Sequence, residues 1–96
     1  MTLKEFLLNG KKYWGFEGEM YPGSNLAFIK GSKGFIMCGY LNLETAEKMN
    51  NVAAIVTGVK TVDDMLNKNI LSSTTNAQKI GIVTGISVLK ALEKIG

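Results

Sequence analysis

The sequence contains no histidine and only one cysteine, Cys38, among its 96 residues. A single cysteine cannot form an internal disulfide, and the grouped Cys and His ligands of a zinc site are lacking. We therefore expect no metal and no cofactor. A lone free thiol is typical of a reducing compartment, so we expect a cytoplasmic protein.

Arginine is also absent: all 11 basic residues are lysine, and with 8 acidic residues the net charge is +3. Bidentate recognition of phosphates and guanine edges uses the planar guanidinium group, which lysine lacks. The lysines are spread along the chain and form no basic stripe. These features argue against sequence-specific nucleic-acid binding, although weak contact with polyanions stays open.

Long apolar runs are missing as well. The longest are Phe35–Leu41 and Val52–Val56, far shorter than the roughly 20 residues of a membrane-spanning helix. The short apolar patch within Met1–Leu8 contains Glu5, so it does not have the pattern of a signal peptide. We expect no membrane association.

What is present is a globular composition. Apolar residues make up 46% of the chain and charged residues 20%, a balance far from that of disordered proteins. A chain of 96 residues has room for one core. We expect a single α+β domain over residues 1–96, strand-rich in 1–41 and helix-rich in 42–96.

The first 41 residues have the pattern of two β-hairpins. Leu3–Asn9 and Lys12–Tyr21 are joined around Asn9-Gly10, the dipeptide that most favours a tight hairpin turn. Asn25–Lys30 and Gly34–Leu41 flank a second turn. Both faces of these last two strands are apolar, which predicts central strands covered on two sides.

Helical periodicity follows from residue 42 onward. We expect helices that start at or near Asn42, Thr61, Thr75 and Ser87, residues with side chains suited to helix capping. A short apolar strand, Ala53–Thr57, lies between the first two. The predicted fold class is α+β: an antiparallel N-terminal β-sheet with short helices and one further strand in the C-terminal half.

Four short helices can cover one face of such a sheet, but not both. A second copy of the sheet is the simplest cover for the other face, because most soluble oligomers are symmetric homo-oligomers. Surplus apolar and aromatic side chains in the first strands fit this contact: Leu3, Leu7, Tyr13, Trp14 and Tyr21. A monomer with a thick, sandwich-like sheet is the alternative.

Two motifs occur in order along the chain. Residues 33–41 read Lys-Gly-Phe-Ile-Met-Cys-Gly-Tyr-Leu, and residues 58–66 read Gly-Val-Lys-Thr-Val-Asp-Asp-Met-Leu. Both resemble motifs of the YunC-like family of bacterial and archaeal proteins of unknown function. The resemblance implies an α+β fold whose N-terminal β region forms a tetramer, and it implies no known activity. Lys60 stands where some relatives carry arginine, which argues against a role that needs a guanidinium group.

Cys38 is the first candidate for chemistry. A thiolate becomes reactive where a cation or a helix N-terminus lowers its pKa, and Lys60 or the helix start at Thr61 can supply that field. Gly39 would let a ligand approach the thiol closely. Buried free cysteine is a common core residue, however, and the chain has no histidine to act as the base, so we favour packing.

Asp63 and Asp64 are candidate acid/base or ligand-binding groups. Adjacent helical residues point about 100° apart, so the two carboxylates are not expected to act as a pair. Acids in a first helical turn also satisfy free N–H groups and complement the helix dipole, and we favour that role. The preceding loop, 58–61, has a position suited to anions, but the two aspartates would repel phosphate.

The leading hypothesis is a homo-oligomeric binding or regulatory module, a tetramer formed through the N-terminal strands. Its small-molecule ligand, of unknown identity, would bind near Cys38 and the 58–64 loop. The alternative is a small-molecule enzyme with Cys38 as nucleophile. Candidate ligand-binding residues are Gly39, Lys60, Thr61, Asp63 and Asp64.

Overall fold

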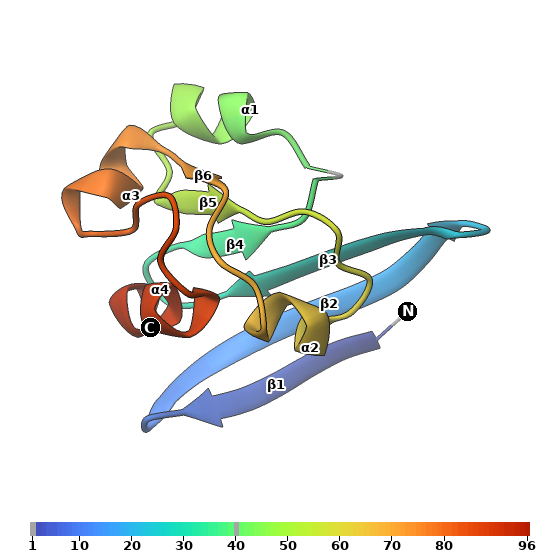
Figure 1. Cartoon of the computed structure of the whole chain (residues 1–96). Coiled ribbons are helices and arrows are strands. Elements are labelled where there is room, and N and C mark those ends of the chain that lie inside the picture. The colour runs from blue at the N-terminus through green and yellow to red at the C-terminus, as the bar shows by residue number, and fades with distance from the viewer. Residues whose placement is uncertain (1, 40) are drawn as a thin grey trace.

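The computed structural model describes residues 2–39 and 41–96. These residues form a six-stranded sheet in the order β1-β2-β3-β4-β5-β6, with four short helices around it (Figure 1). The strands are β1 Thr2–Leu8, β2 Lys11–Tyr21, β3 Ser24–Lys30, β4 Phe35–Met37, β5 Ala53–Ile55 and β6 Ser72–Ser73. The helices are α1 Leu43–Lys48, α2 Val62–Leu66, α3 Thr75–Lys79 and α4 Val88–Ile95. Because most strand pairs are antiparallel, the predicted α+β class is confirmed.

The Asn9-Gly10 turn joins β1 to β2, as the sequence predicts. Both residues have positive φ angles, 52° for Asn9 and 78° for Gly10, which a two-residue type I′ turn requires. The resulting register places Leu3 opposite Phe16. β2 and β3 form a long hairpin whose tip projects beyond the helices (Figure 1).

One side of the sheet, the inner face, is covered by α2 and α4 and carries the main core (Figure 1). Alternate residues of the central strands point to this side and are fully buried: Tyr13, Ala27, Ile29 and Ile36. α4 contributes four buried side chains at helical spacing: Val88, Ala91, Leu92 and Ile95. Burial of a large apolar side chain contributes about 1.5–3 kcal/mol, so this cluster holds the helices against the sheet.

β4 and β5 form a parallel pair connected by α1. A parallel pair needs a crossover connection rather than a tight turn, and α1 supplies it. As predicted, Asn42 caps α1: its side-chain oxygen accepts a hydrogen bond from the backbone N–H of Thr45 at 3.1 Å. α1 packs Ala46 against Met37 on the opposite side of the sheet, the outer face.

The outer face of β1 and β2 carries no helix within residues 2–39 and 41–96 (Figure 1). Leu3 and Leu7 of β1 are 69% and 71% exposed there. Trp14 and Phe16 of β2 are half-buried, and Phe16 stacks on Phe28 with ring centroids 5.3 Å apart. An apolar, partly aromatic surface is therefore left open on this side.

The strand predicted over Gly34–Leu41 is shorter in the structure. Pairing ends at Met37, because the chain then turns: the backbone N–H of Leu41 donates to the carbonyl of Cys38 at 3.2 Å. Tyr40, which the prediction included in the strand, lies outside the described residues.

Two further details differ in the C-terminal half. α3 is capped by Thr74 and not by Thr75, since the Thr74 hydroxyl oxygen accepts from the backbone N–H of Ala77 at 3.3 Å. β6 was not predicted, because two serines carry no strand pattern. Its pairing with β5 depends on the tertiary fold.

Tyr13 is not a surface residue, which corrects its place among the candidate subunit contacts. The alternation of β2 points it to the inner face, and its side chain is 0% exposed. Its hydroxyl donates a hydrogen bond to the carbonyl of Leu92 in α4. Tyr13 therefore contributes to the core of its own chain.

Candidate functional site

Cys38 follows β4 and lies in the main core, where it is only 3% exposed. Its Sγ accepts a hydrogen bond from the backbone N–H of Ala27 at 3.3 Å. The neighbouring Gly39 is exposed, and a Cβ there would come no closer than 3.4 Å to Thr57. The thiol is closed to solvent in this conformation, so the geometry favours a packing role.

The loop before α2 is held by its own capping residues. The Thr61 hydroxyl oxygen accepts from the backbone N–H of Asp64 at 3.1 Å. The Asp64 carboxylate accepts in turn from the backbone N–H of Lys60, also at 3.1 Å. The Lys60 carbonyl accepts from the Asn25 side-chain amide at 3.4 Å, which links the loop to β3. The side chains of Thr61 and Asp64 are thus both engaged in hydrogen bonds that cap α2.

The candidate residues from the sequence do not share one pocket in the described part of the chain. The Cys38 side chain lies inside the core, whereas Lys60, Asp63 and Asp64 are exposed. Val59 packs in the same apolar cluster as Cys38, so the loop and the cysteine are connected through the core. A common site would require the thiol to become exposed.

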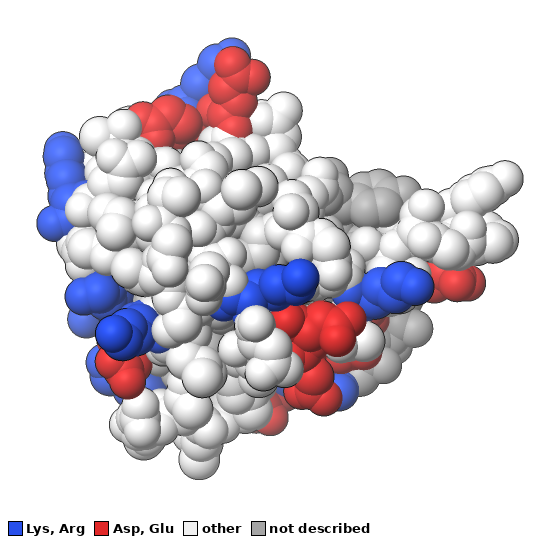
Figure 2. Space-filling model, viewed as in Figure 1, with Lys and Arg blue, Asp and Glu red and all other residues white. Residues whose placement is uncertain are grey.

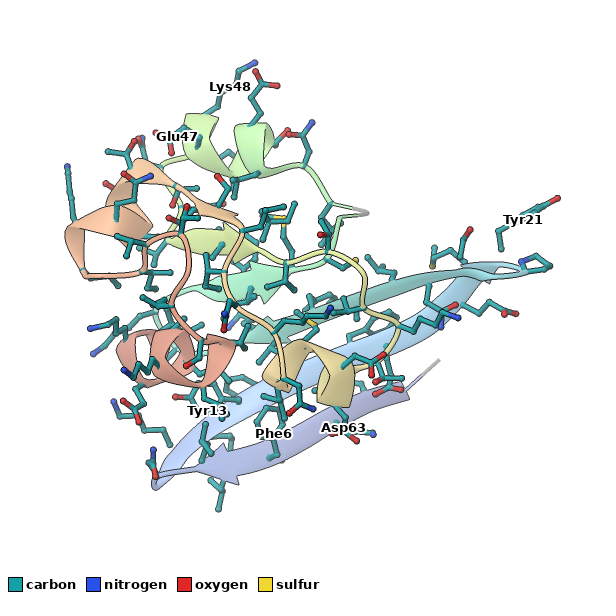
Figure 3. The ribbon with its side chains drawn as sticks, in the orientation of Figure 1. Phe6, Tyr13, Tyr21, Glu47, Lys48 and Asp63 are labelled. Carbon is teal, nitrogen blue, oxygen red and sulfur yellow. The ribbon has the colours of Figure 1, made fainter. Side chains whose placement is uncertain are left out.

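A pocket of about 450 Å³ lies between β1 and α2. Its lining residues are Lys4, Glu5 and Phe6 from β1 and Val62, Asp63 and Leu66 from α2. Figure 3 shows Phe6 and Asp63 below α2, on the side that faces β1. A volume of this size is typical of small-molecule sites. Asp63 is the sequence candidate that lines the pocket.

Of the charged residues that line this pocket, Lys4 and Glu5 have ion-pair partners and Asp63 has none among the described residues. Lys4 Nζ lies 3.4 Å from Glu17 Oε1, and Glu5 Oε1 lies 3.5 Å from Lys12 Nζ. Within residues 2–39 and 41–96, no ion pair or side-chain hydrogen bond to the Asp63 carboxylate is found. Figure 2 shows acidic side chains grouped at α2, with lysine side chains immediately beside them. The Asp63 carboxylate is therefore free to pair with a bound ligand.

Gly15 and Glu17 in β2 set the position of α2. A Cβ at residue 15 would lie 2.9 Å from a methyl carbon of Val62, closer than real contacts allow. The Glu17 carboxylate accepts from the backbone N–H of Val62 at 3.3 Å. This N–H belongs to the first helical turn, where the helix itself offers no acceptor. The two β2 residues thereby bring α2 close to the sheet.

Tyr13 supports the aromatic wall of the pocket. Its ring stacks on Phe6, with centroids 5.7 Å apart and an interplanar angle of 24°. Burial, with a smaller contribution from the charge of Glu93, raises the pKa of the Tyr13 phenol above its usual 10.0. The phenol therefore keeps its proton, and its hydrogen bond to Leu92, throughout the neutral range.

Sequence reasoning missed the β1 side of this pocket. Lys4, Glu5 and Phe6 are far from α2 in sequence, and β1 precedes the two family motifs. The one available signal was alternation, which places Phe6 on the face opposite Leu3 and Leu7. Only the tertiary contact with α2 makes these residues part of a site.

Within residues 2–39 and 41–96, no helix is long and apolar enough to cross a lipid bilayer. No group of three or more His, Cys, Asp or Glu side chains in this part of the chain is arranged to hold a metal ion. The pocket between β1 and α2 is the candidate site with the clearest geometry.

Three similarities connect the chain to known proteins. Residues 37–95 match the family DUF1805, described as a domain of unknown function. The chain is 33% identical to the uncharacterized protein YunC of Bacillus subtilis (strain 168), over 99% of this chain and 97% of that protein. Its fold matches the crystal structure of a protein of unknown function, TA1206 from Thermoplasma acidophilum, with a TM-score of 0.94 and 41% identity over 99% of this chain and 92% of that one. The chain belongs to the YunC-like family and carries its DUF1805 domain.

Proposed function

We propose that the protein is a homo-oligomeric binding module, a tetramer assembled through its N-terminal strands. Its small-molecule ligand binds beside the 58–64 loop, in the pocket between β1 and α2. The observation that supports this proposal best is the open apolar surface on the outer face of β1 and β2. The buried free thiol of Cys38 is compatible with a cytoplasmic setting.

The outer face carries a continuous apolar strip across three strands. Leu3 lies opposite Phe16, and Phe16 lies opposite Phe28 in the next pair. Trp14 adjoins the strip, with Lys30 Nζ 5.1 Å from its ring centroid. Contiguous exposed apolar surface with polar residues at its border is typical of protein contact sites. A second sheet packed here would remove this surface from water.

β1 also offers an open strand edge. It pairs with β2 on one side, and no described residue pairs with its other side. The strand is seven residues long, and its sequence contains no proline. Such an edge is a template for pairing with another chain, which is why monomers usually shorten or cover it. β6, at the opposite end of the sheet, is only two residues long.

The face and the edge together favour a tetramer over a dimer. Each can form a self-complementary contact with the same surface of a second copy, related by a two-fold axis. Two different two-fold contacts on one subunit generate a closed tetramer of dihedral symmetry when their axes cross at right angles. The apolar strip supplies burial for one contact, and the edge of β1 supplies backbone hydrogen bonds for the other.

Light scattering coupled to gel filtration tests the assembly. We expect a particle of four times the 10.4 kDa chain mass. A particle of two chains would contradict the tetramer but retain self-association through the N-terminal strands. A particle with the mass of one chain, at concentrations well above those in the cell, would contradict the proposal.

A further inference from the structure

We infer that the pocket between β1 and α2 binds a small organic cation, an amine attached to an apolar body. This inference rests on the proposed ligand-binding role and names the class of ligand. The volume of about 450 Å³ accommodates a small molecule. The apolar and charged parts of the lining each select one part of the ligand.

The apolar part consists of Phe6, Val62 and Leu66. Val62 is 3% exposed, while Phe6 and Leu66 are half-buried and keep some surface toward the pocket. Stacking on Tyr13 holds the Phe6 ring in place. An aromatic ring attracts cations through its face as well as apolar groups through its area. This part of the lining fits a compact apolar body.

The charged part favours a cation over an anion. Lys4 is the basic residue in the lining, and it is already paired with Glu17. The Glu5 carboxylate points to the outer face, like Leu3 and Leu7, and is engaged there by Lys12 and by the Trp14 indole N–H, at 3.5 and 3.1 Å. The exposed Asp63 carboxylate is the lining charge for which residues 2–39 and 41–96 provide no such partner.

A bound amine would pair with Asp63 while its apolar body rests on Phe6 and Leu66. A carboxylate or phosphate would be repelled by Asp63 and would have to displace Glu17 from Lys4. The pocket therefore discriminates by charge sign. The first turn of α2 contributes Asp63 as a counter-ion, and Asp64 is occupied by the Lys60 backbone.

Three compounds of similar size and different charge test this inference on the intact, assembled chain. Saturation-transfer NMR titrations would compare 2-phenylethylamine, the neutral 2-phenylethanol and the anionic 3-phenylpropionate. We expect the amine to bind most tightly and the anion most weakly. Equal affinities for the three, or no binding of the amine, would overturn the inference.

Asp63→Asn removes the charge with little change of shape at an exposed position. We expect it to weaken amine binding about two- to fivefold, the upper part of the range for an exposed ion pair, and to leave the alcohol unaffected. Glu44→Gln is the matched control, since Glu44 is also a first-turn acid of a short helix but lies in α1. Equal weakening by both variants would assign the preference to net charge and would overturn the site.

The outcomes separate this inference from the proposed assembly. A single-chain particle that still prefers the amine through Asp63 would contradict the assembly and support the pocket. A tetramer without that preference would overturn the pocket and leave the assembly intact.

Discussion

Tyr13 shows how one side chain connects three parts of this fold. Its ring contacts Phe6 of β1, its backbone belongs to β2, and its hydroxyl donates to the carbonyl of Leu92 in α4. Because Leu92 lies in the last turn of α4, its carbonyl is one of those that helix termini leave to other donors. A tyrosine at this position therefore satisfies a helix end while it fills the core.

The raised pKa of Tyr13 predicts a loss of stability at alkaline pH. Burial favours the protonated phenol in the folded chain, so the stabilisation is complete below pH 10.0, the usual pKa of tyrosine. It is lost as the pH rises through the higher pKa of the folded state. Urea unfolding followed by Trp14 fluorescence at increasing alkaline pH would measure this loss.

Tyr13→Phe should make the stability less dependent on pH in that range. At neutral pH it should also cost about 1–2 kcal/mol, because the Leu92 carbonyl loses its donor. Tyr21→Phe is the control, since Tyr21 is 71% exposed at the tip of the β2–β3 hairpin (Figure 3). An alkaline transition unchanged in Tyr13→Phe would contradict this account.

Cys38 provides a second prediction for a single residue. Its 3% exposure predicts that a thiol reagent leaves native Cys38 unmodified until the chain is unfolded. Cys38→Ser should destabilise by about 1–3 kcal/mol, since a hydroxyl would be buried without an assured acceptor. Rapid modification of the native protein across neutral pH, with unchanged stability of the serine variant, would instead favour the nucleophile hypothesis.

Single contacts also decide where whole elements lie, and α2 is the clearest case. With five residues it is too short to be stable alone, so its position depends on β2. Gly15 leaves the space that Val62 occupies, and Glu17 accepts the first-turn N–H. The pocket between β1 and α2 exists because β2 holds α2 at this distance.

Gly15→Ala should therefore destabilise the chain by about 1–3 kcal/mol through overpacking against Val62. In a Val62→Ala background the same methyl would enter vacated space, so its cost should fall below about 1 kcal/mol. A double-mutant cycle from chemical denaturation would measure the difference as a coupling energy. Costs that simply add would show that the alanine clashes elsewhere.

α1 and α3 are joined by hydrogen bonds between Glu47 and Thr75. Glu47 of α1 accepts hydrogen bonds from the hydroxyl and the backbone N–H of Thr75, at the first turn of α3. The hydroxyl bond, followed by the N–H bond, lowers the pKa of Glu47 from its usual 4.5. Figure 3 shows Glu47 on the α1 side of this junction.

The lowered pKa predicts acid sensitivity. The stabilisation by Glu47 is present above pH 4.5 and is lost as the pH falls through the lower pKa of the folded state. Glu47→Gln should reduce the drop in thermal midpoint on acidification, while Glu44→Gln in the same helix should not. Parallel acid profiles for the wild type and both variants would contradict this role of Thr75.

For the whole molecule, the outer face should control assembly. Replacing Leu3 and Leu7 together by lysine places like charges on the proposed contact. Because both side chains are about 70% exposed in the single chain, we expect the subunit fold to survive and the assembly to dissociate. Leu89→Lys, at a 45% exposed position on α4, is the control.

Light scattering and circular dichroism together test this variant pair. We expect the Leu3/Leu7 double variant to form smaller particles with an unchanged circular dichroism spectrum, and the Leu89 variant to keep the wild-type mass. Dissociation caused equally by Leu89→Lys would place the contact elsewhere on the chain.

Local signals in the sequence were sufficient for most elements. Asn9-Gly10 specifies its own turn through two positive φ angles, and Asn42, Thr61 and Ser87 cap helices as predicted. Predictions failed at β6, whose partner β5 is remote in sequence, and at the end of β4. The strand predicted over Gly34–Leu41 continued past Met37 because apolar residues continue there, whereas the chain turns to make its hydrogen bonds at Cys38.

The sequence alone determined the α+β class, the hairpins, the helix starts and the family, because turn chemistry, capping and alternation act between residues close in the chain. Tertiary structure alone decided that β4 and β5 run parallel, that Cys38 is buried, and that Lys4 and Phe6 meet Asp63 across a pocket. Those facts depend on contacts between distant segments, for which a single sequence contains no local signal. The absence of histidine and arginine argued against a zinc site and against bidentate recognition of phosphates, and the packing of α2 on β2 showed where a ligand has room.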